Sequence, residues 1–391
     1  MTRGLTLVTG VWSPGGLRRS VVRSGAVYTR LLEELLLFVE TPIVVLVDPP
    51  LLPDVERAVE GALRRGQARG LPPAEVAIRE RPLASLPFVR DLKKYERFQR
   101  PGRSATRKDS VDFSLMTWAK AELVREIAVS NLCDTTHIGW IDAGIMHVAD
   151  AGSAASWDEI EKAACDSDRI RILQRMASSP DEVDDPDHWY AWNVARVAGG
   201  LITMPRAGAW RLAAAVLEEA ERAASVERFA LEEQLLAAAE TRHPELFERY
   251  YGDYFGILTN VRFIRRDLET VLANLSHCRA SGIPAAGADV ARALLRSVTQ
   301  ERLRLEPGEA IVLLDDGIAC LRDVGDLVAA RNLASLAAGL RAASSTMRYA
   351  LQMQRDRSAS LAKAIRALDV DTTSTTAVLE HEDLDGFLSL L

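Results

Sequence analysis

Residues 42–48, PIVVLVD, decide the fold class of this 391-residue chain. After the proline come five consecutive branched aliphatic residues, and the run ends on Asp48. An unbroken apolar run of this length fits a strand that is covered on both faces, as strands are inside a parallel sheet. It therefore predicts an α/β protein built on a mostly parallel sheet.

The chain on either side of this strand alternates between strands and helices. Residues 5–12, LTLVTGVW, are apolar and rich in branched side chains, which predicts a first strand. Residues 26–40 have the apolar spacing of an amphipathic helix, and residues 54–70 and 75–81 predict a second helix followed by a strand. This order is typical of a Rossmann-related sheet sandwiched by helices.

The same alternation continues further along the chain. Helices are predicted at 112–130, 207–224 and 228–242, and strands are predicted at 136–142 and within 192–206. The α/β pattern therefore extends well past the middle of the chain.

The last part of the chain is rich in Ala, Leu and Arg at helical spacing. We expect an α/β domain at 1–280, an α-helical C-terminal appendage at 281–368 and an acidic, flexible tail at 369–391. Residues 327–368 contain no proline and predict a long helix that either packs on the α/β domain or joins subunits of a homo-oligomer. Residues 309–317 fit either an isolated strand or the start of a buried helix.

Composition limits the functional classes. A net charge of −7 at pH 7 disfavours a nucleic-acid-binding surface, which needs a basic excess. The four cysteines form no CxxC pair, which is usual in a reducing compartment. The sequence has no secretory signal pattern and no apolar run of about 20 residues that would cross a membrane. We therefore expect a cytoplasmic protein without a transmembrane segment.

Residues 7–19, LVTGVWSPGGLRR, have the general form of a nucleotide-binding turn. A redox enzyme of the short-chain class would need the pattern TGxxxGxG, and Pro14 replaces its middle glycine. Proline has no N–H to offer to a pyrophosphate. No Tyr-x-x-x-Lys pair follows to supply a proton. The loop therefore disfavours a dinucleotide redox enzyme.

Asp142 ends a predicted strand in the sequence GWIDAG at 139–144. Ligands of open α/β sheets bind at the carboxyl ends of the strands, so we expect this carboxylate to face a ligand. Ala143 and Gly144 leave room for a phosphate or a sugar near the backbone. The alternative is an aspartate that caps a turn or a helix.

Lys120 lies on the apolar face of the predicted helix that precedes this strand, in one stripe with Met116 and Ile127. Burying an unpaired ammonium group costs several kcal/mol. The side chain therefore either reaches the rim of the protein or meets an anion, such as a phosphate.

Glu232, Glu233 and Gln234 interrupt an apolar helix in the sequence FALEEQLL at 229–236. Because their neighbours form a packed stripe, at least one of the three is expected to point toward that stripe or toward a cleft. A carboxylate on a rigid helix suits a general base for a sugar hydroxyl. The alternative is a solvated flank of the helix.

The chain resembles the HtrL/YibB family of bacterial proteins in motifs that occur in the same order. They are VTG at 8–10, WIDAG at 140–144, the pair Gly199–Gly200, EEQ at 232–234, HPELF at 243–247 and YYGDYFGILTN at 250–260. That family is grouped with GT-A-type glycosyltransferases. The resemblance covers residues 5–265, and the last third of the chain has no counterpart.

The resemblance implies a GT-A-like catalytic domain that moves a sugar from a nucleoside-diphosphate sugar, most often UDP-linked, to a hydroxyl group. The acceptor is a carbohydrate, a lipid-linked precursor or a small molecule. In this scheme Asp142 holds Mg²⁺ or Mn²⁺ and the donor diphosphate, with Lys120 balancing charge. Glu233, with Glu232 as competitor, handles the acceptor hydroxyl.

The resemblance also assigns residues to the substrates. The donor-binding set is Thr9, Gly10, Arg18, Arg19, Lys120, Asp142, Ala143, Gly144, Gly199, Gly200, Gln234 and Asn260. Tyr254 is a further expected ligand contact. We expect Trp189, Tyr190 and Trp192 to form a wall on the acceptor side.

One departure from the GT-A pattern bears on the metal. Many of these enzymes have Asp-x-Asp, whereas Gly144 takes the third position here. A single carboxylate holds Mg²⁺ or Mn²⁺ weakly, so phosphates, water or His147 would have to complete the ligands. The alternative is that the basic segment 90–108 closes over the diphosphate in place of a metal.

A second functional class also stays open. It is a non-catalytic protein with the nucleotide-sugar fold, whose C-terminal helices act as an assembly module.

Overall fold

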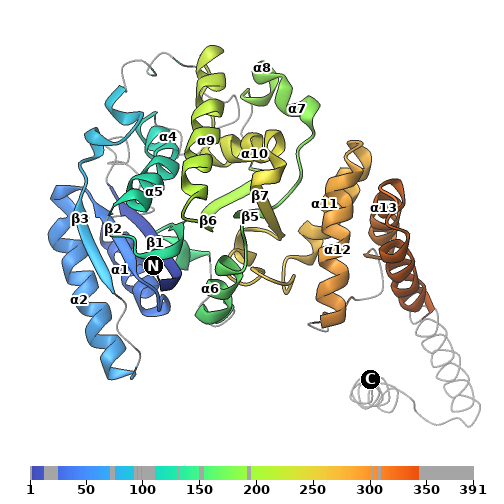
Figure 1. The fold of residues 1–391 in the computed structure, drawn as a ribbon, viewed down its shortest axis with the longest axis horizontal. Coiled ribbons are helices and arrows are strands. Elements are labelled where there is room, and N and C mark those ends of the chain that lie inside the picture. Colours follow the sequence, from blue (N-terminus) through green and yellow to red (C-terminus); the bar gives the residue numbers. More distant parts are fainter. Residues whose placement is uncertain are drawn as a thin grey trace, which may run out of the picture.

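The computed structural model describes residues 2–12, 25–70, 75–91, 95, 98, 111–130, 132–148, 154–191, 195–300, 303, 305 and 310–342. Within these residues a seven-stranded sheet runs through the centre of the molecule, with helices on both faces (Figure 1). The strands are β1 Thr2–Val11, β2 Ile43–Val47, β3 Val76–Glu80, β4 Thr135–Ile141, β5 Ile170–Gln174, β6 Val197–Pro205 and β7 Phe247–Tyr251.

The helices of the α/β part are α1 Gly25–Phe38, α2 Leu52–Ala68, α4 Val111–Trp118, α5 Lys120–Val129, α6 Trp157–Cys165, α7 Pro180–Asp184, α8 Pro186–Trp189, α9 Gly208–Ser225 and α10 Glu232–Arg242. The helices that follow are α11 Leu268–Ala280, α12 Pro284–Gln300 and α13 Ala310–Asp323. Short 3₁₀ turns include η5 Ile145–His147 after β4 and η7 Tyr254–Gly256 after β7.

The strand order is β3-β2-β1-β4-β6-β5-β7. β6 runs antiparallel to both of its neighbours, and the other described pairings are parallel. All five residues of β2 are buried, as its unbroken apolar run predicts. The predicted fold class is confirmed: a mostly parallel, Rossmann-like sheet sandwiched by helices, with a helical C-terminal region.

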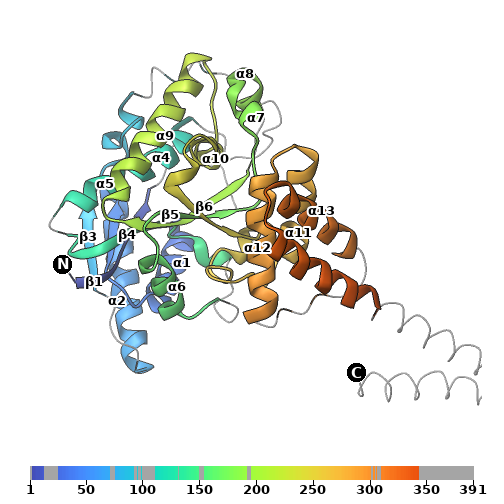
Figure 2. The same ribbon diagram turned by 45° about the vertical axis from the view of Figure 1, so that its right-hand side comes forward.

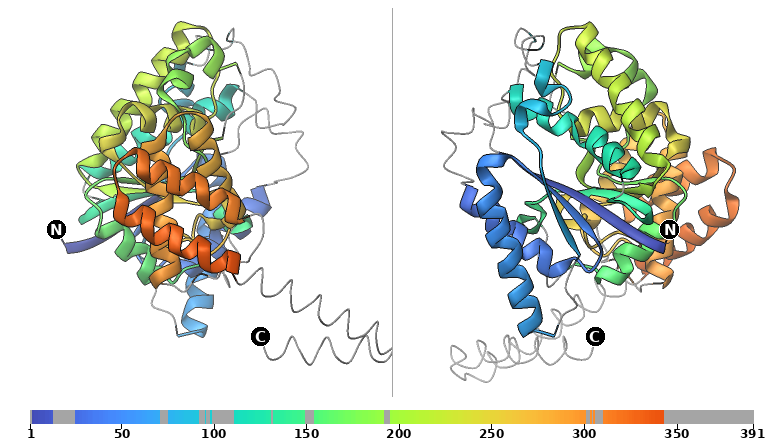
Figure 3. Two further views of the ribbon diagram at one scale, coloured as in Figure 1. Left: turned by 90° about the vertical axis from the view of Figure 1, so that its right-hand side faces the viewer. Right: turned by 60° about the vertical axis from the view of Figure 1, so that its left-hand side comes forward.

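Each face of the sheet has its own apolar core. Helices α4, α5, α9 and α10 cover one face, where Trp118, Leu123 and Leu235 pack with the strands. Helices α1, α2 and α6 cover the other face through residues such as Leu32 and Trp157. Figure 3 shows α2 beside β1, β2 and β3 in its right-hand view. Both layers position the side chains that reach the edge of the sheet.

Two predicted helices differ in the structure in a way that affects the site. The predicted helix 112–130 is divided at Ala119, so that Lys120 opens α5. Helix α10 begins at Glu232 and not at 228, because Leu231 has an extended backbone with φ −69° and ψ 150°. Glu232 and Glu233 therefore lie in the first turn of α10, where the positive end of the helix dipole favours carboxylates.

The C-terminal helices share a third apolar core. Leu275 of α11, Leu294 of α12 and Leu314 of α13 are fully buried in it. Figure 2 shows these helices grouped beside the β5–β7 end of the sheet. The open alternative at 309–317 is decided in favour of a helix, and the first helix of this core, α11, begins at Leu268.

A further helix spans 327–342, and the remainder of the predicted helix 327–368 and the predicted tail 369–391 are not among the described residues. In the part of the chain that is described, no helix combines the length and the apolar character needed to cross a membrane.

Candidate functional site

The carboxyl edge of the parallel strands carries Asp142, which directly follows β4. Its backbone N–H donates to the carbonyl oxygen of Gly200 at 2.9 Å, which extends the pairing of β4 with β6. The parallel register of Val8 with Trp140 places Gly10, two residues further on, level with Asp142. The Asp142 side chain is 42% exposed, so the carboxylate lies at the edge of the sheet and reaches solvent.

Lys120 joins Asp142 to Glu232. Its Nζ lies 2.8 Å from Oδ1 of Asp142 and 2.7 Å from Oε2 of Glu232. The side chains of Lys120 and Glu232 are only 11% and 9% exposed. Trp140 supports the arrangement, because its Nε1 donates to Oδ1 of Asp142 at 2.7 Å and its ring lies 5.5 Å from Nζ of Lys120. Of the two alternatives for Lys120, its ammonium group meets acidic side chains, and these belong to the protein itself: Asp142 and Glu232.

Burial sets the protonation of this group. Burial by itself would lower the pKa of Lys120, but the carboxylates of Asp142 and Glu232 outweigh it and raise that pKa. The pKa of Glu232 is raised to about 8, chiefly because burial disfavours its charged form, although Lys120 opposes the rise. At neutral pH Glu232 therefore keeps its proton, and Asp142 balances the ammonium group.

Gly199 and Gly200 of β6 leave room for the side chains of Glu232 and Asp142, because neither glycine carries a Cβ atom. A Cβ on Gly199 would lie 2.7 Å from Oε1 of Glu232, and one on Gly200 would lie 3.6 Å from Oδ2 of Asp142. A cavity of about 10 Å³, the size of one water molecule, adjoins Lys120, Trp140 and Glu232. Oε1 of Glu232 is buried and has no hydrogen-bond partner among the described residues.

We expect Gly199→Ala to lower the free energy of unfolding by about 1–3 kcal/mol, because the new methyl group pushes Glu232 away from Lys120. Gly200→Ala is the matched control. Its methyl group would meet the side-chain ends of Ile257 and Ile145 at 3.1 and 3.4 Å, so we expect a loss below about 1 kcal/mol. Urea unfolding of both variants measures the difference in stability. Equal losses of stability would contradict the close packing of the Glu232 side chain against Gly199.

A second polar group lies at the same edge. The Tyr254 hydroxyl donates to Oε1 of Glu233, and the Arg175 guanidinium lies 4.6 Å from the Tyr254 ring. Nε of Arg175 also pairs with Oδ1 of Asp253 at 2.7 Å. Arg175 and Asp253 follow β5 and β7, as Asp142 follows β4, and the sequence prediction missed both. Their signal is a charged residue one or two positions after a strand, and it can be read from the sequence only once the strand is recognised.

Several residues that were predicted to bind the sugar donor pack instead against other parts of the protein. Thr9 is fully buried in β1, and the space left by Gly10 holds the ring of Trp12. Ala143 is buried, and a Cβ on Gly144 would lie 3.3 Å from the ring of Tyr28. The space beside Asp142 that was predicted to accept a phosphate or a sugar is therefore occupied on this side by Tyr28 of α1.

Gln234 and Asn260 are also buried, at 0% and 1% exposure. The Gln234 amide donates to the carbonyl of Trp189, and Nδ2 of Asn260 donates to the carbonyls of Tyr251 and Arg266 at 2.9 Å. Both amides thus donate to backbone carbonyl groups of the protein itself. Arg18, Arg19 and most of the basic segment 90–108 fall outside the residues that the structure describes.

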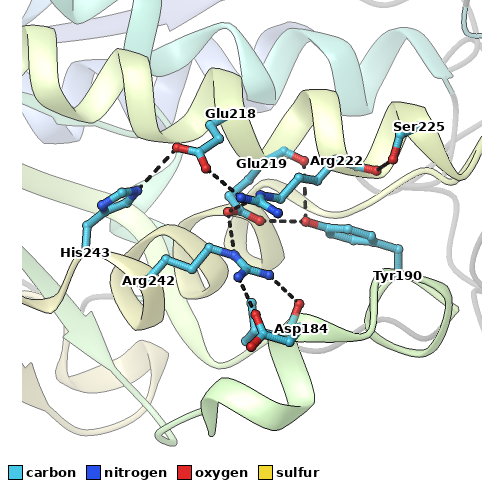
Figure 4. Close-up of polar contacts among 9 residues, drawn as sticks. Asp184, Tyr190, Glu218, Glu219, Arg222, Ser225, Arg242 and His243 are labelled. Atoms are coloured by element: carbon cyan, nitrogen blue, oxygen red, sulfur yellow. Dashed lines mark hydrogen bonds and ion pairs between the residues drawn. The ribbon is translucent and has the colours of Figure 1, made fainter.

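The predicted acceptor wall is wrong for two of its three members. Trp189 and Tyr190 are 3% and 1% exposed, because α8 packs them into the core between α9 and α10. The Tyr190 hydroxyl donates to Oε2 of Glu219 at 2.8 Å, and Arg242 pairs with Oε1 of Glu219 at 3.0 Å (Figure 4). The third member, Trp192, is not described.

Comparison with known proteins gives a family and loosely similar solved structures. Curated protein sequences give no match. A solved structure, 4-diphosphocytidyl-2C-methyl-D-erythritol synthase from Anaerococcus prevotii, is 12% identical with a TM-score of 0.32, over 70% of this chain and 96% of that chain. At this TM-score the likeness supports no conclusion about function. A family model described as "Bacterial protein of unknown function (HtrL_YibB)" matches residues 3–262. Because that match spans more than half of the 391 residues, the chain belongs to the HtrL_YibB family.

Proposed function

We propose that this protein is a glycosyltransferase that moves a sugar from a nucleoside-diphosphate sugar, with UDP as the first candidate, to a hydroxyl-bearing acceptor. The observation that carries the proposal is the position of Asp142. It follows β4 at the carboxyl edge of a Rossmann-like sheet, is 42% exposed, and is tied on its inner side to Lys120. Small ligands of such sheets bind at this edge. The GT-A-like motifs of the sequence favour a nucleotide sugar as that ligand.

The transfer needs one bond to break and one to form. The bond between the anomeric carbon and the β-phosphate oxygen breaks, the acceptor oxygen bonds to the anomeric carbon, and the nucleoside diphosphate leaves. We assign the acceptor proton to Glu233, because Glu232 is already held by Lys120. Tyr254 orients the Glu233 carboxylate, and Arg175 brings a positive charge close to Tyr254. Asp142 holds the donor.

We expect a nucleotide sugar from a panel of UDP-glucose, UDP-galactose, UDP-N-acetylglucosamine and GDP-mannose to raise the melting temperature of the full chain. Asp142→Asn should weaken binding of that nucleotide sugar at least tenfold, about 1.4 kcal/mol, in calorimetric titration. Asp168→Asn is the control, because the Asp168 side chain is 96% exposed beside the sheet and should leave binding unchanged.

The alternatives give different results in the same assays. Binding followed by release of the nucleoside diphosphate supports the transferase, and no binding by any member of the panel rejects it. Binding without release across the panel would favour the non-catalytic assembly module. The exposed Leu327 and Val328 of the C-terminal helix, at 64% and 74%, would then be the first residues to test for assembly. A rise in melting temperature with NAD(P) alone would favour the redox enzyme.

A further inference from the structure

The described residues around Asp142 do not fit a divalent metal. Mg²⁺ and Mn²⁺ prefer about six oxygen ligands, and Asp142 has already committed Oδ1 to Lys120 and Trp140. No group of three or more His, Cys, Asp or Glu side chains suited to a metal occurs within the described part of the chain. Nδ1 of His147, the other candidate ligand, contacts the carbonyl oxygen of Gly144.

A cation nevertheless lies between two carboxylates at this place. Nζ of Lys120 is within 2.8 Å of oxygens from both Asp142 and Glu232, which come from different elements of the fold. The ammonium group arrives on α5, which is fixed to the sheet by the buried side chains of Leu123 and Val124. The ammonium group is therefore a permanent positive charge of the protein at this position, whereas a metal ion could dissociate.

We propose that Lys120 takes the place of a divalent metal ion between Asp142 and Glu232. The two carboxylates then hold a protein ammonium group and need no metal. Oδ2 of Asp142, the oxygen that Lys120 and Trp140 leave unused, accepts a hydrogen bond from a hydroxyl group of the bound sugar or ribose. The hydrogen bond from the substrate rests on the proposed function, whereas the replacement of a metal ion by Lys120 does not.

Removing the ammonium group should create a metal site. Lys120→Ala frees oxygens of Asp142 and Glu232 that both lie within reach of one point, and the adjoining cavity of about 10 Å³ enlarges by the volume of the lost side chain. Mn²⁺ with a few water molecules then fits between the two carboxylates.

The test is a calorimetric titration of the full chain with Mn²⁺ alone at pH 8. We expect no Mn²⁺ site at Asp142 in the wild type, and Lys120→Ala should bind Mn²⁺ at least tenfold more tightly than the wild type and melt at a higher temperature when Mn²⁺ is present. Lys120→Ala with Glu232→Gln should lose the gained site. Lys162→Ala, which removes an exposed lysine of α6, should behave as the wild type.

Two results would overturn the proposal. One is Mn²⁺ binding by the wild type that Asp142→Asn abolishes, and the other is a folded Lys120→Ala protein that gains no Mn²⁺ binding. If Lys120→Ala does not fold, Lys120→Gln keeps most of the side chain while removing its charge, and the same gain is expected of it because its amide oxygen can join the two carboxyl groups as a Mn²⁺ ligand. The titration contains no nucleotide, so its outcome does not depend on the nucleotide-sugar panel. A wild type that binds UDP-glucose only with Mn²⁺ would overturn the proposal and leave the glycosyltransferase standing.

Discussion

Replacing Lys120 by methionine is expected to lower the free energy of unfolding at pH 7 by about 2–4 kcal/mol. Methionine fills similar space but donates no hydrogen bond to Glu232 and brings no charge to Asp142, which lie 2.7 and 2.8 Å from the ammonium group. The loss is large because the Glu232 side chain is only 9% exposed, so bulk water cannot solvate the carboxyl group that has lost its donor. Urea unfolding followed by circular dichroism measures the change.

A double variant separates the lost pair from lost packing. Lys120→Met with Glu232→Leu leaves no buried group without its partner, so it should recover most of the stability that Lys120→Met alone loses. Lys162→Met is the matched control, because that lysine is exposed on α6 and its loss should change stability by less than about 0.5 kcal/mol. A double variant no more stable than Lys120→Met would show that Glu232 is not what makes the single substitution costly.

Glu232→Gln is expected to change how stability depends on pH. The pKa of Glu232 is raised from its usual 4.5 to about 8 in the folded protein, chiefly by burial. The folded state therefore holds this proton more tightly than the unfolded state. Its contribution to stability is fully present below pH 4.5 and is lost as the pH rises through 8. Glutamine does not titrate and lacks this dependence.

The stability of Glu232→Gln relative to the wild type should consequently rise between pH 4.5 and 8. Each pKa unit corresponds to about 1.4 kcal/mol, so the full change is at most about 5 kcal/mol. Glu60→Gln is the control, because the Glu60 side chain is 67% exposed on α2 and should leave the pH profile of the wild type unchanged. Parallel pH profiles for Glu232→Gln and the wild type would show that Glu232 is charged at neutral pH.

The sequence predicted the α/β part best where a local pattern is strong. β2 is an unbroken apolar run, and its burial on both faces follows from that pattern alone. β5 and β7 were not predicted, because charged residues interrupt them. Arg171 in β5 is nevertheless buried, since Glu248 of β7 pairs with it at 3.2 Å. Such a pair becomes visible only when the two strands are adjacent.

The positions of Asp142 and Lys120 in the fold were predicted from the sequence, whereas their contacts were not. Asp142 was expected at a strand end and Lys120 on an apolar face, and each is found there. The sequence suggested a phosphate as the partner of Lys120, but the structure supplies Glu232, which is more than 100 residues away along the chain. Trp189 and Tyr190 were expected on the surface, and they are buried because α9 supplies Glu219 as a partner for the Tyr190 hydroxyl.

By itself the sequence determined the order of strands and helices in its clearest segments, the parallel character of the first strands and the family to which the chain belongs. These follow from side-chain periodicity and motif order, which are local properties of the chain. Only the tertiary structure decided that β6 inserts antiparallel between β4 and β5, and that Lys120 joins the half-exposed Asp142 to the buried Glu232. The reason is physical: protonation and pairing depend on which distant groups exclude water together, and local sequence does not encode that.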